Sequence, residues 1–153
     1  MVANQAARTL DGVLLLDKPP GLSSNAATQR VRRLAGGARA GHVGTLDPLA
    51  SGMLPICLGE ATKIAGAILA GEKCYRFTLA LGERTTTGDA EGAVVERCDV
   101  PPLDPDAVVA VLARFVGPQR QVPPMFSALK HRGEPLYRLA RAGRSVERAA
   151  RPV

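Results

Sequence analysis

The stretch Gly41–Gly59, GHVGTLDPLASGMLPICLG, carries the most information about the fold of this chain. It places a histidine, an aspartate before a proline and four glycines around an apolar run. Pro48 favours an extended backbone at Asp47, and glycines let the chain bend or approach a ligand closely. A carboxylate in such a loop is suited to act as a nucleophile or a general base. Taken alone, the Asp-Pro pair is also typical of an ordinary turn.

Local signals on both sides of this loop predict further strands and helices. Val13–Leu16 is a short apolar run typical of a buried strand. Ser23 or Ser24 is expected to cap a helix that runs to about Leu34 and ends at two glycines. Ala27, Val31 and Leu34 are expected to share one apolar face of this helix. The further expected strands are at 53–58, at 74–81, where apolar residues alternate, and at 93–97, as a return strand. A short helix is expected at 60–69, and another helix is expected to start at Asp104. The apolar face of this last helix is expected to consist of Val108, Val111, Leu112 and Phe115. This interleaving of strands and helices predicts a mixed α/β or α+β class.

Composition indicates a globular domain with an uneven charge distribution. The 153 residues are 46% hydrophobic and 22% charged. The net charge is +6, and residues 122–153 hold 7 basic and 2 acidic residues against 13 and 12 in residues 1–121. A basic block of this kind suits a phosphate backbone, although a solvated surface is the alternative.

Other sequence features restrict the classes of site and the location. The cysteines at positions 57, 74 and 98 form no CxxC pattern, and the two histidines are far apart, so we expect no metal site. Cys57 and Cys74 lie in apolar runs and are expected to be buried thiols. The sequence has no GxxxxGK[ST] motif, no secretory apolar region and no apolar run of transmembrane length. We therefore expect a cytoplasmic protein with a flexible leader at residues 1–10.

Four collinear runs resemble the TruB family of bacterial tRNA pseudouridine synthases. The runs are GVLLLDKPPGLSSN (Gly12–Asn25), RAGHVGTLDPLASGMLPICLGEATK (Arg39–Lys63), KCYRFTLALGERTTTGDAEG (Lys73–Gly92) and PPMFSALKHRGEPLYRLARAG (Pro123–Gly143). The resemblance implies a curved, largely antiparallel sheet flanked by helices, in a protein that is monomeric when complete. It also implies isomerisation of the T-loop uridine of tRNA (position 55) to pseudouridine, without a metal or an organic cofactor.

The resemblance assigns roles to five residues. Asp47 falls on the family's catalytic aspartate, and His42 on the histidine that takes the place of the flipped base. Tyr75 falls on the tyrosine that packs against the target base, and Lys18 and Pro19 on the pair that supports the site. These residue types suit the chemistry, because a stacked uridine must leave the helix to react and flat rings can replace or hold it. The residues themselves also allow a loop histidine bonded to backbone, a core tyrosine, and a lysine that binds phosphate or simply lies on the surface.

The basic segment at residues 122–151 resembles an RNA-gripping insertion of the family. Its side chains are best suited to phosphate contacts, which give affinity and register but no base choice. The expected contacts are Lys130, Arg132, Arg138, Arg141 and Arg144. Specificity for the T-arm stem-loop would then come from the shape of the RNA.

One departure from the family pattern bears on activity. The family pairs its aspartate with a basic residue in a Gly-Thr-Tyr-(Ile or Val)-Arg strand, and this sequence holds no such run. We therefore expect residues 11–153 to be the N-terminal part of a catalytic domain, without the remaining strands and the C-terminal RNA-binding domain. Arg39 and Arg84 are other basic residues, but no geometric reason promotes either.

Two alternative functions stay open at this level. The chain is alternatively a module that binds or folds tRNA without turnover, which the missing arginine strand favours. A glycoside hydrolase would need a second carboxylate, for which Asp89 is a candidate. For the isomerase, the first step is open among attack at C1′, attack at C6 and removal of the C2′ proton.

Overall fold

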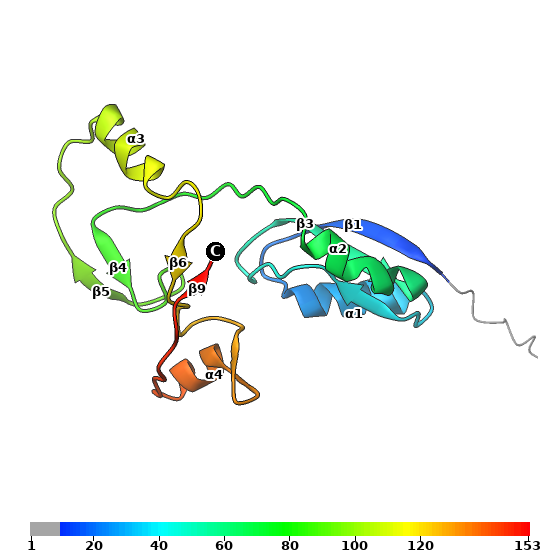
Figure 1. The fold of residues 1–153 in the computed structure, drawn as a ribbon. Helices are drawn as coiled ribbons and strands as arrows, with labels where there is room; N and C mark the ends of the chain where they lie inside the picture. Colours follow the sequence, from blue (N-terminus) through cyan, green and yellow to red (C-terminus); the bar gives the residue numbers. More distant parts are fainter. Residues whose placement is uncertain (1–9) are drawn as a thin grey trace, which may run out of the picture. The chain divides into compact units, whose positions relative to one another are not determined.

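The computed structural model describes residues 10–153, so nearly all of the predicted leader at 1–10 lies outside the described residues. The chain forms two compact units, of which the first ends at Arg76 and the second spans Phe77–Val153. The first unit contains β1 (Gly12–Lys18), α1 (Ser24–Leu34), β2 (Ala40–His42), β3 (Gly52–Leu58), the 3-10 helix η1 (Gly59–Ile64) and α2 (Ala65–Leu69) (Figure 1). The second contains β4 (Glu83–Thr85), β5 (Val94–Arg97), α3 (Pro105–Ala113), β6 (Arg120–Gln121), β7 (Lys130–His131), β8 (Glu134–Pro135), α4 (Leu136–Arg141) and β9 (Arg151–Pro152).

The first unit is built on a three-stranded antiparallel sheet in the order β1–β3–β2. The register pairs Leu16 with Leu54 on one side of β3 and His42 with Ile56 on the other. Strands form at both predicted places, 13–16 and 53–58. The expected burial of the first strand is wrong, because Val13, Leu14 and Leu15 are exposed and no described element covers them. Strand β2 was not predicted, because Ala-Gly-His carries no apolar run and is defined as a strand by its pairing with β3.

Helix α1 covers one face of this sheet and forms the core with it. Ser23 caps the helix by accepting a hydrogen bond from the Ala26 N–H at 3.2 Å, as predicted. Ala27 and Val31 pack against the sheet residues Leu54, Ile56 and Leu58. Leu34, the third residue of the predicted apolar face, is 89% exposed. It lies in the last helical turn and is not among the side chains packed against this core.

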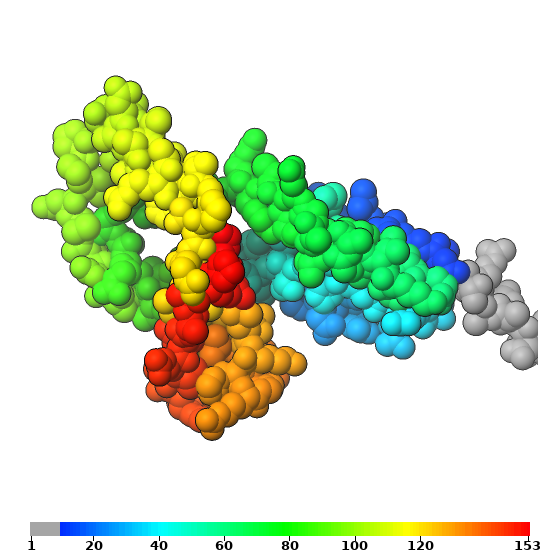
Figure 2. Space-filling model, viewed as in Figure 1, coloured from blue at the N-terminus to red at the C-terminus, as the bar shows by residue number. Residues whose placement is uncertain are grey.

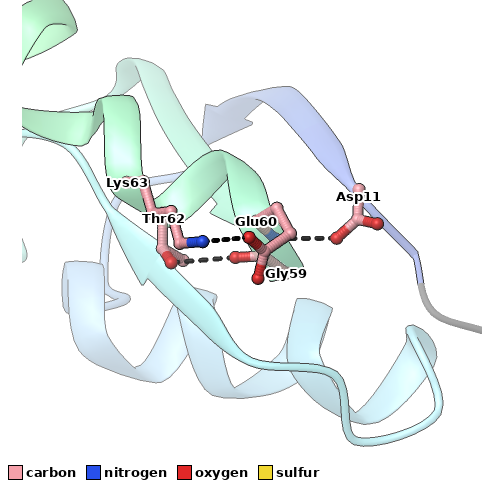
Figure 3. A network of polar contacts seen from close by, with 5 residues as sticks. All are labelled: Asp11, Gly59, Glu60, Thr62 and Lys63. Carbon is pink, nitrogen blue, oxygen red and sulfur yellow. Dashed lines mark hydrogen bonds and ion pairs between the residues drawn. The ribbon is translucent and has the colours of Figure 1, made fainter.

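The chain leaves β3 through a tight turn that the start of β1 holds in place (Figure 3). Asp11 Oδ1 accepts a hydrogen bond from the Glu60 N–H at 2.7 Å, and the Thr62 hydroxyl donates to the Gly59 carbonyl at 2.8 Å. Gly59 has a φ of 55°, and a Cβ there would lie 2.0 Å from Asp11 Oδ1. The single helix predicted for 60–69 is therefore divided: a 3-10 turn starts under the Asp11 cap and continues as α2.

In the second unit, β4 and β5 form an antiparallel hairpin, and α3 starts where predicted. The Asp104 carboxylate accepts a hydrogen bond from the Asp106 N–H at 3.1 Å, and Pro105 occupies the first helical position. No described element covers the predicted apolar face of α3, and Phe115, which was expected on that face, lies just beyond the helix and is 72% exposed. Burial needs a facing surface as well as the correct helical spacing.

The expected strand at 74–81 is also not formed, although its apolar residues alternate. The described residues provide no strand that pairs with this segment, and backbone alternation alone cannot make a sheet. Cys74 is consequently exposed, whereas Cys57 on β3 is buried as predicted. The prediction for Cys74 failed because an apolar run indicates burial only when another element covers it.

The predicted insertion at residues 122–151 forms a lobe between two paired strands, and its last residue, Arg151, belongs to the second of them. Strands β6 and β9 pair through Arg120 with Pro152 and Gln121 with Arg151, so the excursion between them starts and ends at one place. It carries the β7–β8 hairpin and α4, seen as the orange atoms of Figure 2. Leu136 and Leu139 of α4 are buried. The segment between β6 and β9 therefore folds into a small substructure of its own.

These elements confirm the mixed α/β class. Every strand pairing of the described chain is antiparallel, and the strands are divided among one three-stranded and three two-stranded sheets. Within residues 10–153, no helix has the length and apolar character to cross a membrane. The same residues show no group of three or more histidine, cysteine or acidic side chains arranged for a metal ion.

Candidate active site

The Asp47 loop connects β2 to β3 in the first unit, and Asp47 is exposed within it. Ser24, in the first turn of α1, holds the residue that precedes Asp47. Its Oγ accepts a hydrogen bond from the Leu46 N–H and donates one to the Leu46 carbonyl, each at 2.9 Å. One buried hydroxyl thus satisfies both backbone groups of Leu46 and fixes the position of the backbone directly before Asp47.

Lys18 holds the other flank of the loop from inside the protein. Its side chain is 0% exposed, and Nζ donates to the carbonyls of Leu22 at 2.7 Å, Pro19 at 2.9 Å and Pro48 at 3.5 Å. The Gly21 N–H donates to the same Pro48 carbonyl at 2.7 Å. An ammonium has three donors, and all three are directed at carbonyls. The surface-lysine interpretation of Lys18 is therefore wrong, and its ammonium ties the Lys-Pro-Pro-Gly turn to the residue that follows Asp47.

His42 is the last residue of β2 and is half-buried. Its Nδ1 lies 3.0 Å from the hydroxyl of Thr28, one turn of α1 after Ser24. Burial lowers the pKa of His42, because desolvation disfavours the charged imidazolium. Nδ1 of His42 therefore bonds to a buried side chain. The alternative of a loop histidine bonded to backbone expected a main-chain partner instead.

The sequence reasoning missed the roles of Ser24 and Thr28. The sequence predicts Ser23 or Ser24 as the helix cap, and in the structure Ser23 makes the cap and Ser24 bonds to the loop. The available signal was their four-residue separation, which places two hydroxyls on one face of the helix. Nothing in the sequence showed that this face would meet the Asp47 loop.

The other site residues named from the sequence are in more open positions. Tyr75 is 66% exposed and belongs to no strand or helix, so the interpretation of Tyr75 as a core residue is wrong. Arg84 pairs with Glu96 across the β4–β5 hairpin at 2.7 Å. Asp89 is held in the turn of the same hairpin, where a 2.6 Å hydrogen bond from the Thr87 hydroxyl lowers the pKa of its carboxyl. The side chain of Arg39 is exposed at the end of the segment that leads into β2.

The five predicted phosphate contacts are all exposed in the second unit: Lys130, Arg132, Arg138, Arg141 and Arg144. Arg132 and Gly133 form the two-residue turn between β7 and β8 with φ values of 51° and 88°. Two positive φ angles in such a turn are typical of a type I′ hairpin, which places the Arg132 side chain at its tip. On α4, the Arg141 guanidinium lies 5.4 Å from the centre of the Tyr137 ring, within the range of a cation–π contact.

The fold and this loop define a class of protein. The chain is similar to a solved structure described as a Cbf5-Nop10-Gar1 complex, with a TM-score of 0.53 and 28% identity over 92% of this chain and 32% of that chain. The fold is that of the pseudouridine synthases. A family model described as TruB family pseudouridylate synthase (N terminal domain) matches residues 32–153. The chain belongs to this family.

Curated relatives agree with this assignment. A tRNA pseudouridine synthase B of Chromohalobacter salexigens is 58% identical over the whole chain, which covers 50% of that protein. A protein of the same name from Burkholderia mallei is 62% identical over 97% of the chain and 49% of its own length, and one from Methylococcus capsulatus is 59% identical over 95% and 65%. The chain thus spans about half the length of the first two relatives.

Proposed function

We propose that this chain is the aspartate-bearing part of an enzyme that converts the T-loop uridine of tRNA (position 55) to pseudouridine. Membership of the TruB family and relatives named tRNA pseudouridine synthase B support the reaction class. The observation that carries the proposal is the Asp47 loop. Leu46 and Pro48 are both held by groups of the first unit while Asp47 itself is exposed. A reactive carboxylate needs this combination of fixed geometry and access to substrate.

The reaction exchanges one bond of the nucleotide for another. The N1–C1′ bond breaks, the uracil turns, and a C5–C1′ bond forms, while C5 loses its proton and N1 gains one. Asp47 would start this sequence by attack at C1′, by attack at C6, or by removal of the C2′ proton. Each route uses an ionised carboxylate and needs no metal or organic cofactor.

Three further groups have supporting roles in this proposal. His42 fills the space left by the flipped uridine, because a flat ring can replace a base in the stack. Tyr75 packs against the uracil, and its exposed ring is available for such a contact. The turn of Lys18 and Pro19 supports the wall behind Asp47 through the Pro48 carbonyl.

The lobe at residues 122–151 serves as the RNA-gripping insertion. The five exposed basic side chains from Lys130 to Arg144 contact phosphates of the T arm, and Arg132 is held at the tip of its hairpin. The enzyme acts in the cytoplasm, where unmodified tRNA is available. Residues 11–153 serve as the N-terminal part of its catalytic domain.

One observation favours a tRNA-binding module without turnover as the second candidate. The ion pairs found within residues 10–153 join Lys63 to Glu60, Arg84 to Glu96 and Arg97 to Glu83, and none of them includes Asp47. A paired cation would favour the ionised form of the carboxylate and fix its orientation. An aspartate without such a cation is compatible with a chain that binds tRNA and does not convert the uridine.

Tritium release from a T-arm stem-loop labelled at uridine C5 tests these candidates. The chain is assayed alone and after extension with the C-terminal half of the Chromohalobacter relative. Release by the extended chain, its loss in Asp47→Asn and retained RNA binding by that variant are expected. Release by Asp47→Asn at the rate of the parent would contradict the catalytic role. Binding by a folded extended chain that releases no tritium would support the binding module.

A further inference from the structure

A pair of buried hydroxyls on α1 connects the two residues expected to contact the target nucleotide. Ser24 and Thr28 are each 2% exposed. Ser24 holds Leu46, the neighbour of Asp47, and Thr28 lies against His42. The Thr28 hydroxyl also lies 2.8 Å from the Ser24 carbonyl oxygen. The positions of the histidine and of the aspartate loop are therefore both set from one helical turn.

The contacts of Thr28 determine which nitrogen of His42 carries the proton. A hydroxyl has one proton to donate, and a carbonyl oxygen can only accept. At 2.8 Å, two oxygens without a proton between them would repel, so the Thr28 proton must lie on the side of the Ser24 carbonyl. The hydroxyl oxygen is then left as the acceptor for the 3.0 Å contact with Nδ1. Because Thr28 is buried, water cannot replace either partner.

We propose that Thr28 is a positioning residue that holds His42 with its proton on Nδ1 and a free lone pair on Nε2. This inference rests on the proposed function for its biological meaning, because it names the kind of RNA group that the histidine meets. An unprotonated Nε2 accepts hydrogen bonds and cannot donate one to a phosphate oxygen. His42 therefore contacts a donor of the RNA, such as a base N–H, an exocyclic amino group or a ribose 2′-hydroxyl.

The state of the ring agrees with this assignment. Burial lowers the pKa of His42, so the neutral imidazole is the form present near neutral pH. The arrangement also explains why a threonine fits this position. Its methyl group fills buried space while its hydroxyl bonds back to the carbonyl four residues earlier, a geometry that threonine adopts readily in helices.

Side-chain nitrogen NMR measures the tautomer directly. Long-range proton–nitrogen correlation spectra of the ¹⁵N-labelled extended chain are recorded at about pH 8, above the ordinary histidine pKa of about 6.5. We expect a protonated-type shift at Nδ1 of His42 and an unprotonated-type shift at Nε2. His131, the other histidine of the present 153 residues, provides an internal comparison in the same spectrum. A protonated Nε2 and an unprotonated Nδ1 at His42 in the extended chain without substitutions would overturn the proposal, regardless of the spectra of the variants.

Two substitutions separate positioning from simple packing. Thr28→Val keeps the shape of the side chain and removes the hydroxyl, and we expect it to release His42 to the Nε2–H tautomer or a mixture. Thr28→Ser keeps the hydroxyl and should preserve the Nδ1–H pattern. In the tritium assay, we expect kcat/KM to fall about tenfold for the valine variant, as for the loss of one hydrogen bond, and to be mostly retained for serine. An unchanged Nδ1–H tautomer in Thr28→Val would overturn the role of the hydroxyl.

The prediction of the His42 tautomer and the prediction of activity can each be contradicted without the other. A protein that shows the Nδ1–H form of His42 but no tritium release would support this inference and count against the proposed function. A protein that releases tritium with the proton on Nε2 would do the reverse.

Discussion

Ser24 binds both backbone groups of Leu46 through a single hydroxyl, accepting from the N–H and donating to the carbonyl at 2.9 Å each. The two residues are 22 positions apart in the sequence, and Leu46 directly precedes Asp47. This contact makes the position of the carboxylate depend on the packing of α1 against the sheet. It therefore links the stability of the first unit to the geometry of the candidate active site.

Replacing Ser24 with alanine tests that link. Ser24→Ala leaves two backbone groups of Leu46 without their partner, so we expect a loss of about 1–3 kcal/mol in the free energy of unfolding. We also expect slower tritium release with little change in RNA affinity, because the aspartate loop loses its anchor while the phosphate contacts stay. Ser23→Ala is the matched control, since it removes the adjacent helix cap at a cost of about 1 kcal/mol without touching the loop. Equal effects of both variants on turnover would mean that Ser24 acts only through helix stability.

Replacing Lys18 should lower the free energy of unfolding more than replacing an exposed lysine does. Lys18→Met keeps much of the side-chain volume but removes the ammonium that binds three carbonyls. We expect a loss of about 1–3 kcal/mol in denaturant unfolding, because three carbonyls lose hydrogen bonds from a charged donor that is itself buried. Lys63→Met provides the control, since Lys63 is exposed and makes a surface ion pair with Glu60, worth about 0–1 kcal/mol. A Lys18 variant as stable as the Lys63 variant would contradict the supporting role of the ammonium.

Gly59 combines a left-handed backbone with a close contact, and alanine should not fit there. In Gly59→Ala, the new Cβ would lie 2.0 Å from Asp11 Oδ1 and 2.8 Å from the Leu10 carbonyl. We expect a loss of more than about 1 kcal/mol in thermal or denaturant unfolding, from backbone strain and displacement of the Asp11 cap. Gly36→Ala separates the two causes, because Gly36 has a φ of 68° but nothing within 4 Å of the added carbon. Equal losses in the two variants would assign the whole effect to the backbone.

The basic lobe should govern the salt dependence of RNA binding. In Arg138→Ala/Arg141→Ala, we expect weaker binding to a T-arm stem-loop and a slope of log affinity against log salt reduced by about 2. The measurement is a binding titration at several salt concentrations. Arg84→Ala/Arg97→Ala removes the same charge from side chains already paired with Glu96 and Glu83, and should change the slope less. Equal slopes for the two double variants would mean that the lobe contributes only general charge.

Local sequence was sufficient for several elements. Strands β1 and β3 were found from short apolar runs, α1 from a serine followed by helical spacing, and the start of α3 from an Asp-Pro pair. Each of these signals acts over a few residues, since a cap or an apolar run affects its own segment. The same kind of signal failed for residues 74–81, which form no strand, and it did not show that the apolar face of α3 would be left exposed.

The sequence by itself determined the family, through four ordered runs that include the Asp47 motif, and it determined that β1, α1 and β3 are present in the first unit. Tertiary structure alone decided that Ser24 holds Leu46, that Thr28 meets His42 and that Lys18 is buried beneath Pro48. These pairs are separated by 22, 14 and 30 residues. No local pattern specifies such contacts, because they exist only when α1 and the Lys-Pro-Pro-Gly turn pack against the loop between β2 and β3.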